Sequence, residues 1–342
     1  MGHKIGGRTV SRNGAEETGG AAALRREVAC DESGSDGENL TGGNTEVFAH
    51  ASVALPVDVA AECVREIRLR IRSPAEEYKA SHLLREKHRA VLEWLLDEGG
   101  PIHGHAHVRL TEKAYFVVER TVELLLGDVA QARPLYRQGP GVFGEPGWRE
   151  FLRAANRLLR VRPNGDPLTA GDHFFRTVDA LARARPGTEA AGTLRRLSGA
   201  RPRADAYREG VEAAPPLFPV LNPLFPAIRR TAAHWSADGV PVTLVHDQQN
   251  ALTPGRIASI VQGAWRDGIA LAGLRLVDSR DDARVQIADF LAGIARKIAS
   301  DQLAGSGDPF LAARLRPYVG GWTPAGSVPE WGGPAARDNS GD

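Results

Sequence analysis

The sequence has little cysteine and no long apolar run. Its 342 residues include only two cysteines, Cys30 and Cys63, and these are not in the CxxC spacing. A Cys-rich zinc site is therefore excluded, and two buried free thiols in a reducing compartment are expected. No segment reaches the roughly 18 consecutive apolar residues of a membrane-spanning helix, and the first residues have no apolar signal-peptide core. We expect a cytoplasmic protein with no membrane partner.

Charge of either sign is not in excess. The formal net charge is +1, which excludes a histone-like polycation and an acidic tail protein. Lysine is rare: 38 of the 43 basic residues are arginine, a bias more typical of a GC-rich genome than of selection for phosphate binding. Hydrophobic residues make up 42% of the chain, which is enough for one large domain or two ordinary ones.

Hydrophobic periodicity predicts one ordered domain between two Gly-rich ends. Residues 1–25 and 319–342 have no apolar period and are predicted to be disordered tails. Residues 26–318 alternate between strand and helix patterns, which is typical of a mixed α/β sheet flanked by helices. The stretch from about 112 to 226 is predicted to be a helical insertion. Strands are predicted at 27–31, 46–55, 101–110, 240–247 and 271–278, and helices at 57–70, 82–97, from 253 and at 282–303.

Three aspartates stand where a metal or catalytic site is expected. Asp31 follows the strand-like run EVAC, and Asp247 ends the apolar run VPVTLVHD. The carboxyl end of such a buried strand is where open α/β sheets place their sites. Asp289 lies off the aliphatic stripe of the last predicted helix, and Gly293 one turn later allows a ligand or backbone to approach closely. Each aspartate also has a structural alternative, as a turn, cap or surface carboxylate.

Several short motifs together resemble a bacterial family called domain of unknown function 3800. No single motif is specific, but their order matches from end to end over about residues 26–303, apart from the stretch between 111 and 226, which carries none. The motifs are DESG at 31–34, E-x-K at 77–79, VHD at 245–247, DS at 278–279 and QIADFLAG at 286–293.

This resemblance implies a ribonuclease H-like fold and a metal-dependent nuclease. It maps the acidic residues of such a site onto Asp31, Glu77, Asp247 and Asp289, which would hold two Mg²⁺ or Mn²⁺ ions for hydrolysis of a phosphodiester. In this interpretation Asp31 bridges both ions, Asp247 and Asp289 each bind one, and Glu77 binds or orients water. Lys79 would offset charge on the phosphate.

The neighbours of these residues are expected to have structural roles. Glu32 should point to the opposite face of the strand from Asp31. Asp278-Ser279 is more typical of a turn than of a metal ligand. Glu76 is an alternative to Glu77 as the carboxylate of the E-x-K region.

Arginines recur at helical spacing in the segment WREFLRAANRLLR. Arg149, Arg153, Arg157 and Arg160 would form a ridge that can lie along a nucleic-acid backbone. A solvated helix face is the commoner explanation of such a pattern.

A third pattern places His103, His105 and His107 on one face of a predicted strand. Successive members would stand about 6.6 Å apart, so two can share a metal ion but three would be strained. A half-exposed polar strand face is the alternative. The sequence thus leaves three functions open: a metal-dependent nuclease, a non-catalytic nucleic-acid or protein-binding module with the same fold, and a histidine-metal hydrolase.

Overall fold

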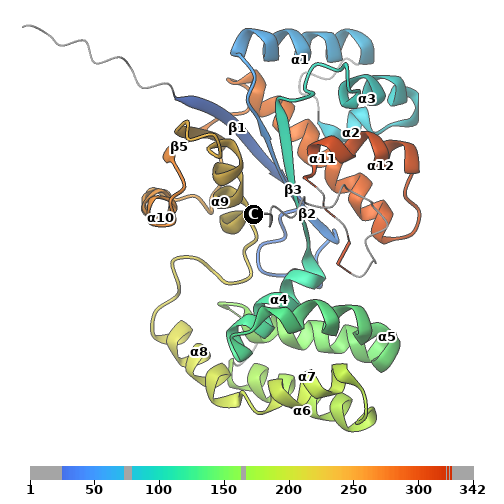
Figure 1. The fold of residues 1–342 in the computed structure, drawn as a ribbon, viewed down its shortest axis with the longest axis vertical. Helices are drawn as coiled ribbons and strands as arrows, with labels where there is room; N and C mark the ends of the chain where they lie inside the picture. Colours follow the sequence, from blue (N-terminus) through green and yellow to red (C-terminus); the bar gives the residue numbers. More distant parts are fainter. Residues whose placement is uncertain (1–24, 73–78, 163–166, 321, 323, 326–342) are drawn as a thin grey trace, which may run out of the picture.

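A mixed sheet covered by helices forms the centre of the protein (Figure 1). The computed structural model describes residues 25–72, 79–162, 167–320, 322, 324 and 325. In these residues the sheet has five strands, β1 (Arg26–Ser33), β2 (Val47–Val53), β3 (Ala106–Glu112), β4 (Val242–Asp247) and β5 (Leu271–Val277), in the order β3-β2-β1-β4-β5. β2 is antiparallel to both of its neighbours, whereas β4 and β5 run parallel to β1. The predicted α/β class with a mixed sheet is confirmed.

One face of the sheet is covered mainly by the long, buried helix α11 (Ala283–Leu303). The helices on this side are α1 (Val57–Ile71), α2 (Ala80–Leu83), η1 (Glu86–His88), α3 (Arg89–Leu96), α11, α12 (Pro309–Leu315) and η3 (Arg316–Tyr318). α11 lies against β1 and β2, and its aliphatic residues share a core with Ala49, Ala51 and Val108 of the sheet. Because α11 is buried on several sides, its position relative to β1 is strongly determined.

The opposite face packs against α9 (Leu224–Trp235) and α10 (Pro254–Arg266). Val28 and Cys30 of β1 point into this second core, whereas Ala29 between them packs with Val285 of α11. This alternation follows from the two-residue period of a strand. Successive residues of β1 therefore face opposite sides of the sheet, and so do the two acids at its end, Asp31 and Glu32.

The helices between β3 and α9 lie beside the sheet at one end of the molecule (Figure 1). They pack around an aromatic and aliphatic core of their own, which includes Trp148, Phe151 and Phe174. A break at Gly144, whose φ is 71°, separates two parts of α5. The elements are α4 (Lys113–Leu126), η2 (Val129–Gln131), α5 (Ala132–Leu159), α6 (Pro167–Ala184), α7 (Glu189–Ser198) and α8 (Arg201–Ala213).

Turn and cap chemistry in the sequence located several elements correctly. β1 and β2, the first two predicted strands, pair antiparallel as a hairpin. Thr253 caps α10 by accepting from the backbone N–H of Arg256, and Asp282 caps α11 by accepting from that of Arg284. Side-chain oxygens of this kind satisfy backbone N–H groups that have no partner within the helix. The boundaries predicted from these signals are confirmed.

Three predicted boundaries are wrong. The helix expected at 82–97 is interrupted, because α2 ends at Leu83 and α3 begins at Arg89. The strand expected at 101–110 begins only at Ala106, after a turn in which Gly104 has a φ of 74°. The C-terminal tail was expected from 319, yet Val319 is buried and the backbone N–H of Ala325 donates to Glu112 Oε2 at 2.7 Å. α12 was not predicted. The remainder of both predicted tails lies outside the described residues.

Candidate active site

The pairing of β1 with β4 brings two of the predicted acids side by side. Cys30 pairs with His246 in parallel register, so Asp31 and Asp247, the next residues, follow on neighbouring strands. Such strands are about 4.8 Å apart. Both aspartates lie two residues beyond a residue that packs toward α11, since Ala29 and Val245 share a cluster with Val285. They therefore occupy the face that α11 covers.

Asp31 has a strongly perturbed carboxyl group. Only 7% of the residue is exposed, and its pKa is raised to about 9, with burial as the largest cause. The negative charges of Glu32, Asp289 and Asp247 contribute to this rise, whereas the backbone N–H of Glu32, which donates to Asp31 Oδ1 at 2.7 Å, works in the opposite direction. The charges of Asp247 and Asp289 act on Asp31 because the ends of β1 and β4 and the helix α11 bring the three side chains near one another. We call Asp31, Asp247 and Asp289 the acidic site.

Asp289 reaches this site from α11, beside a lysine at the start of α2. Lys79 Nζ lies 3.5 Å from Asp289 Oδ2. The approach of α2 depends on Gly293, because a Cβ at that position would meet the Cβ of Ala80 at 2.3 Å. The close approach expected at Gly293 is therefore made by Ala80, the residue after Lys79.

Asp247 is held by the turn that follows β5. The backbone N–H of Ser279 donates to Asp247 Oδ1 at 3.0 Å. Asp278 accepts from the backbone and guanidinium of Arg280, which is the behaviour of a turn residue. This turn thus helps to position Asp247 without itself contributing a carboxylate to the acidic site.

Glu32 points away from the acidic site, as strand alternation predicted. Its carboxylate accepts a hydrogen bond from Gln249 Nε2, and its Oε2 lies 3.5 Å from Nε2 of the fully buried His246. The imidazole of His246 also lies 2.9 Å from the carbonyl oxygen of Asp247 through Nδ1. Sequence reasoning missed these two partners, although both stand in the VHDQQ segment next to Asp247.

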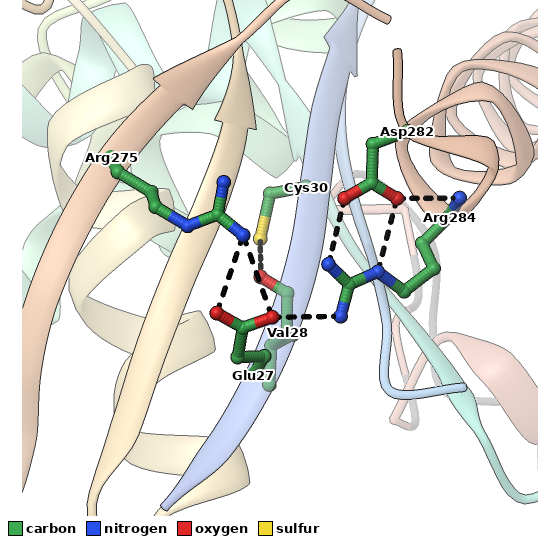
Figure 2. Close-up of polar contacts among 6 residues, drawn as sticks. All are labelled: Glu27, Val28, Cys30, Arg275, Asp282 and Arg284. Atoms are coloured by element: carbon green, nitrogen blue, oxygen red, sulfur yellow. Dashed lines mark hydrogen bonds and ion pairs between the residues drawn. The ribbon is translucent and has the colours of Figure 1, made fainter. Parts of the chain in front are cut away.

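An ion-pair cluster fixes the other end of β1 against α11 (Figure 2). Glu27 Oε2 accepts from Arg284 Nη1 at 3.1 Å, and Arg275 of β5 reaches the same carboxylate at 3.2 Å. Arg284 also donates two bonds to Asp282, which caps the helix. Although burial works against it, hydrogen bonds from both arginines lower the pKa of the Glu27 carboxyl. This cluster helps to set the position of α11, and hence of Asp289.

The acidic site has the donor chemistry of a site for divalent cations. Carboxylate oxygens are the ligands that Mg²⁺ and Mn²⁺ prefer, and a cation beside Asp31 would offset the charges that raise its pKa. Among the described residues no group of three Asp, Glu, His or Cys side chains is arranged so that it could hold a metal ion as it stands. Glu77, the fourth predicted ligand, lies outside the described residues. The donor type fits a hard cation, and the metal remains a prediction.

The predicted arginine ridge lies along the second half of α5, but its four arginines differ in exposure and in their partners. Arg149 and Arg153 are exposed and lie 3.9 and 3.7 Å from glutamates of the same helix. Arg157 donates to Thr169 at 3.1 Å, and Arg160 lies past the end of the helix, where its charge acts on Glu38. Of the four, only Arg149 and Arg153 are exposed, each beside a glutamate, and contact with nucleic acid remains a prediction.

The three histidines do not share a strand face. His103 and His105 are exposed residues of the turn before β3, and only His107 lies in the strand. His107 is buried and stacks on His234 of α9 with ring centroids 3.9 Å apart. The expectation of a common face was wrong because the glycine turn delays the start of the strand. The histidine-metal hydrolase thereby loses its structural basis.

Comparison of the chain with protein-family models, with curated proteins and with solved structures finds no match. The resemblance to domain of unknown function 3800 therefore rests on the motifs alone. Four of these five motifs fall on described residues, and they lie at the ends of β1, β4 and β5 and on α11. Within the described part of the chain, no helix combines the length and apolar character needed to cross a membrane.

Proposed function

We propose that the protein is a metal-dependent nuclease with a ribonuclease H-like domain, which hydrolyses phosphodiester bonds at the acidic site. The observation that carries this proposal is the buried Asp31 carboxyl, which lies among other carboxylates and has a pKa of about 9. Such a group is neutral at pH 7 unless a cation joins it. The origin of the acids in the first strand, a later strand end and a C-terminal helix supports the fold assignment.

The proposed roles follow from where the side chains lie. Asp31 is central, because the charges of both Asp247 and Asp289 act on it, and these three carboxylates would hold Mg²⁺ or Mn²⁺. When bound, two such ions supply an activated water and stabilise the leaving oxygen of a phosphodiester. Lys79, 3.5 Å from Asp289, provides positive charge at the rim that can orient a phosphate. Glu77 is retained as a fourth ligand by resemblance.

The substrate is proposed to be a nucleic acid, and the setting the cytoplasm. The exposed guanidinium groups of Arg149 and Arg153 are candidates for contact with its backbone, since each phosphate neutralised adds salt-dependent affinity. The same fold used as a non-catalytic nucleic-acid or protein-binding module is the alternative. Binding without metal-dependent cleavage would identify the module.

The test compares the two adjacent acids of β1. Purified wild type, Asp31→Asn and Glu32→Gln are incubated with single-stranded DNA, double-stranded DNA and RNA in Mg²⁺, Mn²⁺ or EDTA. We expect cleavage only with metal, loss of at least a hundredfold in Asp31→Asn, and much higher residual activity in Glu32→Gln, which faces the other side of the sheet. Equal activity of both variants and wild type would make DESG a turn and no more. Cleavage that persists in EDTA would reject the metal-dependent mechanism.

A further inference from the structure

A cavity at the β3 edge of the sheet has the character of an anion-binding site. It has a volume of about 340 Å³ and lies between β3, α4, α9 and the residues that follow η3. Arg109, one of its lining residues, pairs with His50, whose imidazole contacts Thr231 of α9. Arg109 therefore enters the cavity from the face that α9 covers, whereas the acidic site lies on the face that α11 covers, at the ends of β1 and β4.

Two guanidinium groups in this cavity have no carboxylate partner. Arg109 comes from β3 and Arg230 from α9, and neither forms an ion pair among the described residues. Arg109 Nε is buried and makes no hydrogen bond within the described structure. Burial lowers the pKa of Arg109, and the positive charge of Arg230 lowers it further. The positive charges of Arg109 and Arg230 are thus close together, and the N–H of Arg109 Nε has no acceptor within the described structure. A bound anion would stabilise both features.

The acidic residues of the cavity are already engaged. Glu112 accepts hydrogen bonds from the Tyr136 hydroxyl and from the backbone N–H of Ala325. Glu119 pairs with Arg120 at 3.0 Å. The carboxylates therefore do not neutralise Arg109 and Arg230, and the cavity keeps an uncompensated positive end.

Aromatic side chains form part of the remaining wall. Tyr115, Phe116 and Trp322 line the cavity, and the guanidinium of Arg133 lies 5.4 Å from the centre of the Tyr115 ring. Flat apolar surface beside paired guanidinium groups suits a ligand that has both an aromatic ring and a phosphate. The volume is within the range of small-molecule sites.

We propose that this cavity binds a small phosphorylated aromatic molecule of the size of a mononucleotide. The phosphate lies between Arg109 and Arg230, and the base or other flat group packs against the aromatic wall. The proposal does not depend on the nuclease assignment, because the cavity lies at the β3 edge of the sheet and shares no residue with the acidic site at the ends of β1 and β4. It makes the cavity a second ligand site.

The test is calorimetric titration with 5′-AMP, inorganic phosphate and adenosine, in EDTA so that no metal bridges the ligand to the acidic site. We expect 5′-AMP to bind more tightly than phosphate, and adenosine to bind weakest. Arg109→Gln and Arg230→Gln should each weaken 5′-AMP at least tenfold, which is roughly the loss of one charge-assisted hydrogen bond. Arg229→Gln is the matched control: Arg229 is the preceding residue of α9 and pairs with Asp267 instead.

Several outcomes would overturn the proposal. These are no heat of binding for 5′-AMP, equal affinity for 5′-AMP and phosphate, or the same weakening in Arg229→Gln as in Arg230→Gln. Asp31→Asn should bind 5′-AMP as wild type does, and a loss of binding there would place the ligand at the acidic site. Arg230 is exposed, so its substitution tests the cavity even where Arg109→Gln disturbs β3.

Discussion

Replacing Asp31 by asparagine should stabilise the metal-free protein in a pH-dependent way. In the folded protein the Asp31 carboxyl keeps its proton up to about pH 9, whereas in the unfolded chain it loses the proton near its ordinary pKa of 3.8. Unfolding between these two values therefore releases a proton, and the free energy of unfolding falls as the pH rises. Asparagine does not titrate, so the variant escapes this loss.

The size of the effect follows from the pKa shift. Each pH unit within the window contributes about 1.4 kcal/mol. The full value between pH 5 and pH 8 is about 4 kcal/mol, and we expect about half of it because local relaxation and water penetration weaken the repulsion. Asp31→Asn should thus gain about 2 kcal/mol relative to wild type on going from pH 5 to pH 8.

Urea denaturation in EDTA at several pH values measures this difference. Glu32→Gln is the control, and it should keep most of the wild-type pH dependence, because burial and not Glu32 is the largest cause of the raised pKa of Asp31. If the acidic site holds Mg²⁺ as proposed, added Mg²⁺ should stabilise wild type more than Asp31→Asn, because the variant lacks one of the proposed ligands. A difference between Asp31→Asn and wild type that does not change with pH would refute the reasoning.

Three further predictions concern the surroundings of the site. Arg284→Ala should lower the free energy of unfolding by about 3 kcal/mol, because it leaves the buried Asp282 carboxylate without its guanidinium partner, whereas the exposed Arg275→Ala should lose less than about 1 kcal/mol in the same urea titration. Gly293→Ala should lose about 1–3 kcal/mol by overpacking against α2 and reduce cleavage with it; stability and activity equal to wild type would show that α2 moves freely. If α5 contacts phosphates, Arg149→Gln with Arg153→Gln should flatten the salt dependence of nucleic-acid binding, and an unchanged slope would make it a solvated face.

The sequence predicted those parts of the fold that depend on local chemistry. The run VPVTLVHD is apolar enough to indicate a buried strand, and it is β4. Thr253 and Asp282 are good cap residues, and both helices begin after them. The alternation of a strand also separated Asp31 from Glu32 correctly. Each of these signals acts over a few residues, so neither long-range pairing nor packing is needed to interpret it.

Signals that depend on long-range contacts were missed. The alternation in PIHGHAHVRL is a genuine two-residue period, yet its first half forms a turn, because pairing with β2 begins only at Ala106. The cavity at Arg109 joins β3, α4, α9 and the residues after η3, which are separated in the sequence by up to about two hundred positions. No local pattern marks such a meeting. The burial of Ala325 likewise depends on Glu112, which is 213 residues away.

The electrostatics of β1 and α11 explain how the protein can tolerate a destabilised acidic site. At one end of β1, Glu27 holds α11 through Arg284, and opposite charges meet there in a cluster whose inner members, Arg284 and Asp282, are buried. At the other end, Asp31 faces Asp289 of the same helix, and like charges meet. Four residues of strand separate the two ends by about 13 Å, and the charges that act on Asp31 are those of Glu32, Asp289 and Asp247 rather than those of this cluster. The attraction at the first end therefore fixes α11 without neutralising the second, so that Asp31 stays among carboxylates.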